Sequence, residues 1–266
     1  MIEYFLRHYE AFAQRIVIYD DDSNDGTRDI LAAHSKVEVR RFARSDPNSL
    51  ELSKVAVFDR CWMESRGLAD YVVIVDCDEH VFHPTLTNYL SEQKRAGVTF
   101  VPTLGFQMIS DQFPGRDEHL AATCTKGCPS IKYSKPIVFD PNAFDTISFG
   151  VGSHDMKPTP MSRVFLPERD EVMLLHYKFL GVDYITERYF QLTSRRRPVD
   201  RRNKWDSHFT LMPDQLRRQF YSYKERVVDV AAKGFSPRAA HDVPLWRTSR
   251  FGERGEVGPY SAAAWM

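Results

Sequence analysis

The sequence predicts an α/β fold with a mainly parallel sheet flanked by helices, and three observations favour it. Apolar segments of strand length alternate with amphipathic segments of helix length in the N-terminal part of the chain. Two of the strand-like segments end abruptly in clusters of aspartates. The length of 266 residues is ample for the buried core of one large domain. Strands that alternate with helices are typical of βαβ units, in which helices cover both faces of a parallel sheet.

The N-terminal elements follow one another closely. Apolar residues recur at helical spacing from Ile2 to Phe12, so a helix is expected to open the chain. A short apolar strand at 16–19 runs into the polar turn 20–27, and a helix is predicted to begin at Arg28. The next predicted elements are a strand at 37–42, a helix from 48 to about 66, a strand at 71–75, a helix from 84 to about 97 and a strand at 98–101.

After Pro102 the pattern is less regular. Residues 105–135 contain Gly, Pro and scattered charge, which predicts long loops over a site. The later predicted elements are a strand at 136–139, a glycine-containing turn at 149–155, a strand at 172–175, and helices at 182–194 and from 213 to about 233. We therefore predict a domain at 1–195, followed by a basic helical extension with a flexible tail at 196–266.

The composition argues against several functional classes. The chain has 36 basic and 36 acidic residues, so its overall charge does not indicate nucleic acid as a partner. No apolar run approaches the ~18 residues of a transmembrane helix, and the N-terminus lacks a signal pattern. Four cysteines are too few for a disulfide framework in a chain this long, which predicts a cytoplasmic protein. Cys124 and Cys128, near His119 and His154, leave a zinc site open as an alternative.

Acidic residues follow two of the predicted strands. Asp20, Asp21 and Asp22 come after the first strand, and Asp76 and Asp78 come after a later one. Ligands of an open α/β sheet bind beyond the carboxyl ends of its strands, so both groups are expected to border one crevice. Closely spaced carboxylates repel one another, and Mg²⁺, Mn²⁺ or Ca²⁺ would relieve the repulsion. A solvated, acid-rich strand end is the alternative that the motif alone leaves open.

Two such clusters suit a nucleotide diphosphate, because one can bind the base and ribose while the other holds a metal on the phosphates. Residues 18–27 resemble the nucleotide-binding segment of family 2 glycosyltransferases, usually a strand followed by Asp-Asp-Gly-Ser-Thr-Asp-Gly-Thr. Residues 75–79 resemble the Asp-x-Asp metal motif of that family. Residues 174–178 resemble the segment whose histidine completes the metal shell in many enzymes of the GT-A fold. Together these motifs span about residues 2–195.

The resemblance implies a GT-A fold and an inverting, metal-dependent transfer of a sugar from a nucleotide-sugar donor, commonly a UDP-sugar. It also implies Mn²⁺ or Mg²⁺ as cofactor and a hydroxyl of a carbohydrate or lipid-linked molecule as acceptor. The residues that it assigns are Asp20, Asp21, Asp22 and Asp76 for the nucleotide sugar, and Asp76, Asp78 and His176 for the metal. A structural, hydrogen-bonded histidine is the common alternative for His176.

An inverting enzyme needs a carboxylate to deprotonate the acceptor hydroxyl. Asp111 is the first candidate and Asp155 the second, although acids in loops are most often simply solvated. The basic run from Arg195 to Lys204 is a further candidate for a contact with diphosphate or with an anionic or lipid-phosphate acceptor. A solvated helix end is the more common reason for such a run.

Two departures from the family pattern keep rival interpretations open. Family members begin with a strand before the opening helix, whereas Met1 here falls within that helix, so the first strand is expected to be missing. Asp22 and Asn24 also replace familiar residues of the aspartate turn. One rival is a catalytically silent module that binds a nucleotide sugar or carbohydrate. Another is a phosphohydrolase of the haloacid dehalogenase type, which requires Thr or Val where this chain has His80.

Overall fold

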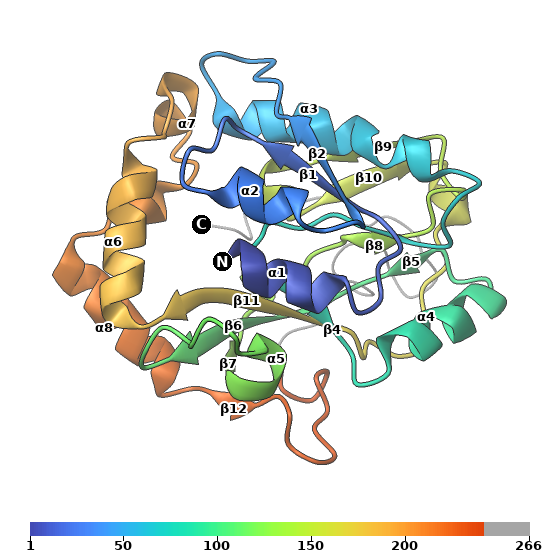
Figure 1. Ribbon diagram of the computed structural model, residues 1–266. Coiled ribbons are helices and arrows are strands. Elements are labelled where there is room, and N and C mark those ends of the chain that lie inside the picture. Colours follow the sequence, from blue (N-terminus) through green and yellow to red (C-terminus); the bar gives the residue numbers. More distant parts are fainter. Residues whose placement is uncertain (242–266) are drawn as a thin grey trace.

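The computed structural model describes residues 1–241 and has an α/β architecture (Figure 1). The predicted tail at 242–266 lies outside these described residues. The helices are α1 Ile2–Tyr9, α2 Thr27–Ala32, α3 Leu50–Cys61, α4 Leu86–Arg95, α5 Leu120–Thr123, α6 Val182–Thr193, α7 Pro198–Arg202 and α8 Pro213–Lys224, with short 3₁₀ helices η1 Met63–Ser65, η2 Ile131–Tyr133, η3 Val151–Ser153, η4 Met161–Arg163 and η5 Ser207–Thr210.

The strands form four sheets within the described part of the chain. The largest sheet has the order β12-β7-β6-β11-β4, and the others are β3-β8-β5, β1-β2 and β9-β10. The strands are β1 Ile16–Asp20, β2 Val37–Arg41, β3 Val72–Val73, β4 Glu79–Phe82, β5 Phe100–Val101, β6 Leu104–Ser110, β7 Lys126–Pro129, β8 Val138–Phe139, β9 Thr146–Phe149, β10 Met156–Thr159, β11 Met173–Leu180 and β12 Val228–Asp229.

The prediction of a mainly parallel sheet is wrong. Only β1–β2 and β6–β11 are parallel pairs, and the other pairings between these strands are antiparallel. The physical reason is the way in which the chain returns after α4. From β6 onward, β6–β7 and β9–β10 pair with their sequence neighbours, and antiparallel neighbours need no crossover helix between them.

The strand predictions before residue 102 are confirmed in type, as are the helices at α1 to α4 and at α6. The long loop predicted at 105–135 is wrong, because it contains most of β6 and all of β7. Six of the seven residues of β6 are buried, so the strand lacks the alternation of polar and apolar residues that marks a half-exposed strand. The last predicted helix ends at Lys224 instead of continuing to 233.

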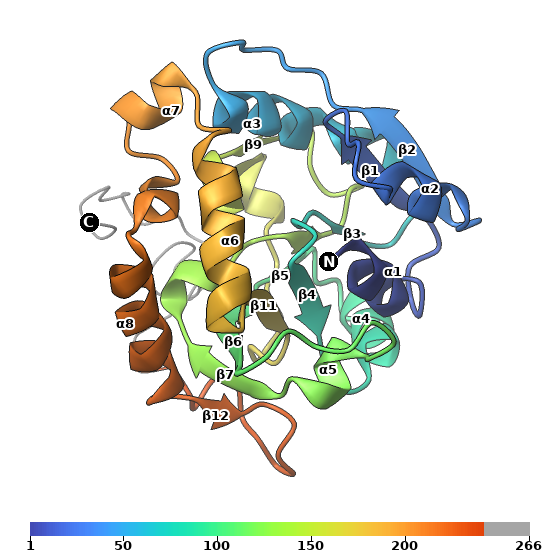
Figure 2. The same ribbon diagram turned by 60° about the vertical axis from the view of Figure 1, so that its left-hand side comes forward.

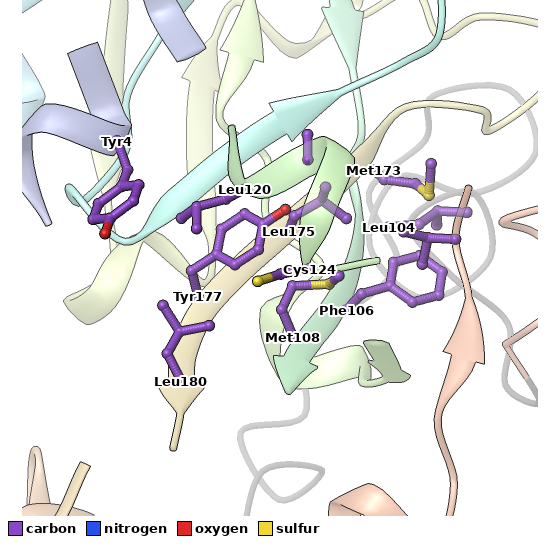
Figure 3. Packing of buried hydrophobic residues seen from close by; sticks show 12 residues of the cluster. Tyr4, Leu104, Phe106, Met108, Leu120, Cys124, Met173, Leu175, Tyr177 and Leu180 are labelled. Atoms are coloured by element: carbon purple, nitrogen blue, oxygen red, sulfur yellow. The ribbon is translucent and has the colours of Figure 1, made fainter. Parts of the chain in front are cut away.

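The core of the large sheet determines which side chains reach its other face. Met173, Leu175 and Tyr177 of β11 pack with alternate residues of β6 in one buried cluster (Figure 3). Because side chains alternate between the two faces of a strand, His176 and Lys178 point to the opposite face of β11. The pairing of β11 with β4 and β6 thus presents a polar set of side chains on that face.

The C-terminal helices pack against one end of this sheet. Figures 1 and 2 show α6, α7 and α8 together along the left-hand side of the molecule. Tyr189 of α6 and Phe220 of α8 share a buried cluster with Phe179 of β11. Burial of a Phe side chain contributes about 2–3 kcal/mol to stability. Residues beyond 195 therefore contribute to the same core as the preceding strands.

Candidate functional site

The candidate site is centred on Asp76 and Asp78, which follow the short strand β3. The Glu79 amide donates to the Asp76 carbonyl oxygen at 3.0 Å, and the Asp76 amide donates to the Glu79 carboxylate at 3.2 Å. These bonds turn the chain directly into β4, a strand that sequence reasoning missed. The turn places two carboxylates between a β3 that pairs with β8 and a β4 that pairs with β11.

The side chains of Asp78 and His176 lie close together, although the two residues come from distant parts of the sequence. Glu79 is the register partner of His176 in the antiparallel β4–β11 pair, and the Tyr177 amide donates to the Asp78 carbonyl oxygen at 2.7 Å. The distance between His176 Nε2 and Asp78 Oδ2 is 3.7 Å. The structure thus brings together two of the three residues that the resemblance assigns to a metal.

The hydrogen bonds of His176 determine which ring nitrogen is free. Gln107 Nε2 donates to the backbone carbonyls of Met108 and His176, so its Oε1 must be the atom that accepts the 2.8 Å bond from His176 Nδ1. Burial, together with the ammonium groups of Lys178 and Lys135, lowers the pKa of His176 and keeps the ring neutral. The unprotonated Nε2 therefore presents its lone pair toward Asp78.

Asp76, in contrast, is paired with a lysine. The ammonium group of Lys54 lies 3.2 Å from the Asp76 carboxylate and 3.9 Å from that of Glu51. Burial alone would raise the pKa of Asp76, but Lys54 and Lys135 outweigh it and lower that pKa. Burial raises the pKa of Glu51 to about 7 even though Lys54 opposes the rise. Lys54 thus neutralises Asp76 with a protein cation.

Two further lysines reach the same region from other elements. Lys135 forms a buried ion pair of 2.5 Å with Glu79. The Lys178 ammonium donates to Nε2 of His208 at 2.8 Å and lies over the ring of Phe209. Sequence reasoning missed these side chains, because they lie far apart in the sequence and the motif at residues 174–178 assigned a role to His176 but none to Lys178. The His-x-Lys alternation on β11 was the one available signal, since it places both side chains on one face.

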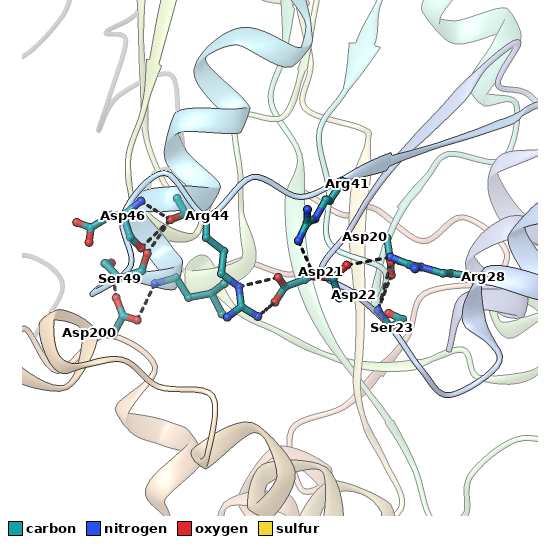
Figure 4. Close-up of polar contacts among 12 residues, drawn as sticks. Asp20, Asp21, Asp22, Ser23, Arg28, Arg41, Arg44, Asp46, Ser49 and Asp200 are labelled. Atoms are coloured by element: carbon teal, nitrogen blue, oxygen red, sulfur yellow. Dashed lines mark hydrogen bonds and ion pairs between the residues drawn. The ribbon is translucent and has the colours of Figure 1, made fainter.

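Each of the three aspartates in the turn after β1 already pairs with an arginine (Figure 4). Asp20 is buried and accepts hydrogen bonds from the Ser23 amide and from Arg28. Burial raises the pKa of Asp20, but these hydrogen bonds outweigh burial and lower the pKa below its ordinary value. Arg44 binds both carboxylate oxygens of Asp21 at 2.7 and 2.6 Å, and Asp22 pairs with Arg28 and Arg41. A bound nucleotide would therefore share or displace these arginines.

A hollow of about 520 Å³ lies beside the turn, and its lining is Asp21, Asp22, Arg41, Phe42, Ala43 and Arg44. A common electrostatic neighbour relates this turn to the Asp76 turn. Arg188 of α6 lowers the pKa of Asp25 in the first turn, where hydrogen bonds to Thr27 have the larger effect. It also lowers the pKa of Cys77 in the second turn, against the larger rise caused by burial. Arg188 therefore lies within electrostatic range of both acidic segments.

The two candidate bases lie apart from the Asp78–His176 pair. Asp111 is exposed and forms an ion pair with Lys224 of α8. It follows β6, whose Gln107 pairs with His176, and four residues of strand correspond to about 13 Å. Asp155 lies between β9 and β10, where its carboxylate packs against Gly150 so closely that a Cβ there would approach Oδ1 to 2.4 Å. Neither forms a polar contact with Asp76, Asp78 or His176 among the described residues.

Metal binding can be judged from these contacts. Within residues 1–241, no group of three or more His, Cys, Asp and Glu side chains is arranged to hold a metal ion. Cys124 and Cys128 therefore do not form a zinc site with other such side chains of this part of the chain. Asp78 and His176 offer one oxygen and one nitrogen ligand. Mg²⁺ is often bound by only one or two carboxylates of the protein while phosphates and water complete its shell. The residues present therefore fit a metal that arrives with a diphosphate.

No helix among residues 1–241 is both long enough and apolar enough to cross a membrane. All four cysteines are free thiols: Cys61, Cys77, Cys124 and Cys128. A comparison of the sequence with models of known protein families gives no match, and a comparison with curated proteins likewise gives none.

Proposed function

We propose that the chain is a glycosyltransferase of the GT-A type that transfers a sugar from a nucleotide-sugar donor, such as a UDP-sugar, to a carbohydrate or lipid-linked hydroxyl. The observation that carries the proposal is the pair formed by Asp78 and His176. Their ligand atoms lie 3.7 Å apart, and Gln107 fixes the tautomer that leaves the facing nitrogen free. The Asp78 carboxylate can hold Mn²⁺ or Mg²⁺ together with a diphosphate, and the neutral imidazole of His176 offers a nitrogen ligand beside it.

The backbone of the aspartate turn supports the resemblance independently. The family motif has Gly at the positions of Asp22 and Gly26 in this chain. Both residues have positive φ here, 55° for Asp22 and 82° for Gly26, which is the region that favours glycine. Aspartate is among the few other residues that tolerate this conformation. An aspartate at position 22 is therefore compatible with a turn that the family motif builds from glycine.

The charges around the pair suit departure of a diphosphate. A divalent ion bound there would neutralise charge on the leaving group. Lys178 lies on the same strand face as His176, and two of its three donors remain beyond the bond to His208. We assign Lys178 to the diphosphate, and Asp20, Asp21, Asp22 and Asp76 to the nucleotide-sugar side. Asp111 and Asp155 stay candidates for the base in an inverting reaction.

The decisive experiment measures UDP release from a panel of UDP-sugars with Mn²⁺, with Mg²⁺ and with chelator. We expect metal-dependent turnover that Asp78→Asn and His176→Ala abolish. Asp70→Asn is the control, because it makes the same change at an exposed aspartate that lies beside Lys94 and away from the pair. Tight binding of UDP-sugar without turnover would instead establish the silent binding module, and phosphate release from simple phosphoesters would establish a phosphohydrolase. The free cysteines support a reducing compartment, and we propose the cytoplasm as its place of action.

A further inference from the structure

The segment that joins α6 to α8, residues 194–212, is strongly basic, and we call it the basic connection. It contains six cations: Arg195, Arg196, Arg197, Arg201, Arg202 and Lys204. Four of these side chains are exposed and form no ion pair with any residue of 1–241: Arg195, Arg201, Arg202 and Lys204. Because the whole chain has no net charge, this concentration of unpaired cations is a local feature.

The two acids of the basic connection face inward. Asp200 is only 2% exposed, and it accepts hydrogen bonds from the Ser49 hydroxyl at 2.5 Å and the Leu50 amide at 3.0 Å. After the larger effects of burial and of nearer charges, Asp206 raises the pKa values of Glu51 and Lys54 in the candidate site. Neither acid compensates the arginines on the outer side of the segment. The connection is thus neutralised toward the protein and cationic toward solvent.

Large apolar side chains lie at both ends of the basic connection. Phe190, in the last turn of α6, is 78% exposed, and Met212, just before α8, is 66% exposed. The Thr193 hydroxyl donates to the Phe209 carbonyl oxygen at 2.6 Å, so the end of α6 contacts the chain just before Met212. Exposed apolar side chains are unfavourable in water unless a partner surface covers them.

We propose that the basic connection docks the protein on an anionic membrane surface. Anionic lipid head groups attract clustered Arg and Lys, and apolar side chains beside the cations enter the boundary between head groups and acyl chains. Nucleic acid would also attract the arginines, but it offers no apolar phase for Met212. The combination of cations with exposed Phe and Met therefore favours a lipid surface.

The inner side of the same segment reaches the candidate site. His208 of η5 accepts a hydrogen bond from Lys178. The Asp206 carboxylate, together with the closer Asp76 and Glu51, raises the pKa of Lys54 against the effect of burial. Docking through the outer side would therefore place the Asp78–His176 pair close to the lipid head groups. This consequence, which rests on the proposed function, narrows the acceptor to a lipid-linked molecule. The membrane binding itself does not depend on sugar transfer.

Co-sedimentation of the full chain with vesicles tests the proposal. We expect sedimentation with phosphatidylcholine vesicles that contain phosphatidylglycerol, weaker binding at higher salt, and none with phosphatidylcholine alone. Arg201→Gln with Arg202→Gln should lower the partition coefficient by roughly tenfold or more. Phe190→Ser should lower it several-fold. The matched controls are Arg95→Gln and Leu68→Ser, because Arg95 is exposed on α4 and Leu68 is 73% exposed outside the connection.

The variants change exposed side chains, so unchanged thermal unfolding will show that a loss of binding is not a loss of folding. The proposal is overturned if the full chain does not sediment with the anionic vesicles, or sediments equally with both kinds. It is also overturned if the connection variants bind like their controls, or if duplex DNA binds while the vesicles do not. None of these outcomes requires a donor sugar, so the vesicle result and the UDP-release result can fail separately.

Discussion

Gln107 fixes the orientation and tautomer of His176. Its Oε1 accepts a hydrogen bond from His176 Nδ1 at 2.8 Å, and its Nε2 donates to the backbone carbonyl oxygen of the same histidine at 2.9 Å. The side chain of Tyr133 stacks on the imidazole at a centroid distance of 4.2 Å. The ring can therefore neither flip nor change tautomer without breaking a buried hydrogen bond, and Nε2 stays directed at Asp78.

Replacement of Gln107 by Leu should release this constraint. We expect the affinity for Mn²⁺ in the presence of UDP to fall about 10- to 100-fold, because partners that orient a ligating histidine typically contribute that much. Electron paramagnetic resonance of free Mn²⁺ measures the change. Gln191→Leu on the exposed face of α6 is the control, and it should bind Mn²⁺ like the parent chain. Equal affinities for both variants would show that Gln107 does not position a metal ligand.

The ion pair between Lys135 and Glu79 is almost completely shielded from water, with exposed fractions of 4% and 2% for the two side chains. Lys135→Met should lower the free energy of unfolding by about 3–5 kcal/mol, because it leaves the Glu79 carboxylate buried without a cation. Adding Glu79→Leu should restore most of that loss. Urea unfolding of the single and double variants measures both effects. A double variant that is no more stable than Lys135→Met would contradict this explanation.

Glu51 should make stability depend on pH. Burial, with Asp206 and Asp76 acting in the same direction, raises its pKa from 4.5 to about 7. A carboxyl group with a raised pKa binds its proton more tightly in the folded state. Its contribution to stability is therefore fully present below pH 4.5, and it is lost as the pH rises to about 7. The loss is on the order of 3 kcal/mol.

Glu51→Gln removes this titration. Relative to the variant, the parent chain should lose stability between about pH 4.5 and 7, and the two curves should run parallel above that range. Chemical denaturation at a series of pH values measures the difference. Glu92→Gln, at an exposed position of α4, should leave the curve unchanged. If the Glu51 variant also parallels the parent through the whole range, the pKa of Glu51 is not raised.

Asp200 joins α7 to the N-terminus of α3. Its carboxylate accepts bonds from the Ser49 hydroxyl and from the amides of Leu50 and Arg197. Asp200→Ala should lower the free energy of unfolding by about 1–3 kcal/mol, because it leaves buried donors without an acceptor. Urea denaturation checks the value against Asp70→Ala, an exposed control. No loss beyond that of the control would mean that α7 is not fixed to α3 through this residue.

The local sequence determined much of the backbone. The apolar run of β1 followed by Asp20, Asp21 and Asp22 predicted a strand and a polar turn, and both are present. The periodicity of the first helices was equally informative, because both signals depend on residues only a few positions apart. The same signals failed for β6, whose residues are buried on both faces, and for β4, which lies within the acidic turn region.

Only the tertiary structure decided which charges meet. The motif resemblance named Asp78 and His176, but their 3.7 Å separation depends on the antiparallel pairing of β4 with β11. Lys54, Lys135 and Lys178 come from three separate segments, and nothing in their local sequence shows that they converge. Periodicity specifies the conformation of a segment and the face that it buries. Partner choice depends on which strands pair and on how much water burial removes around each charge, and both are properties of the whole fold.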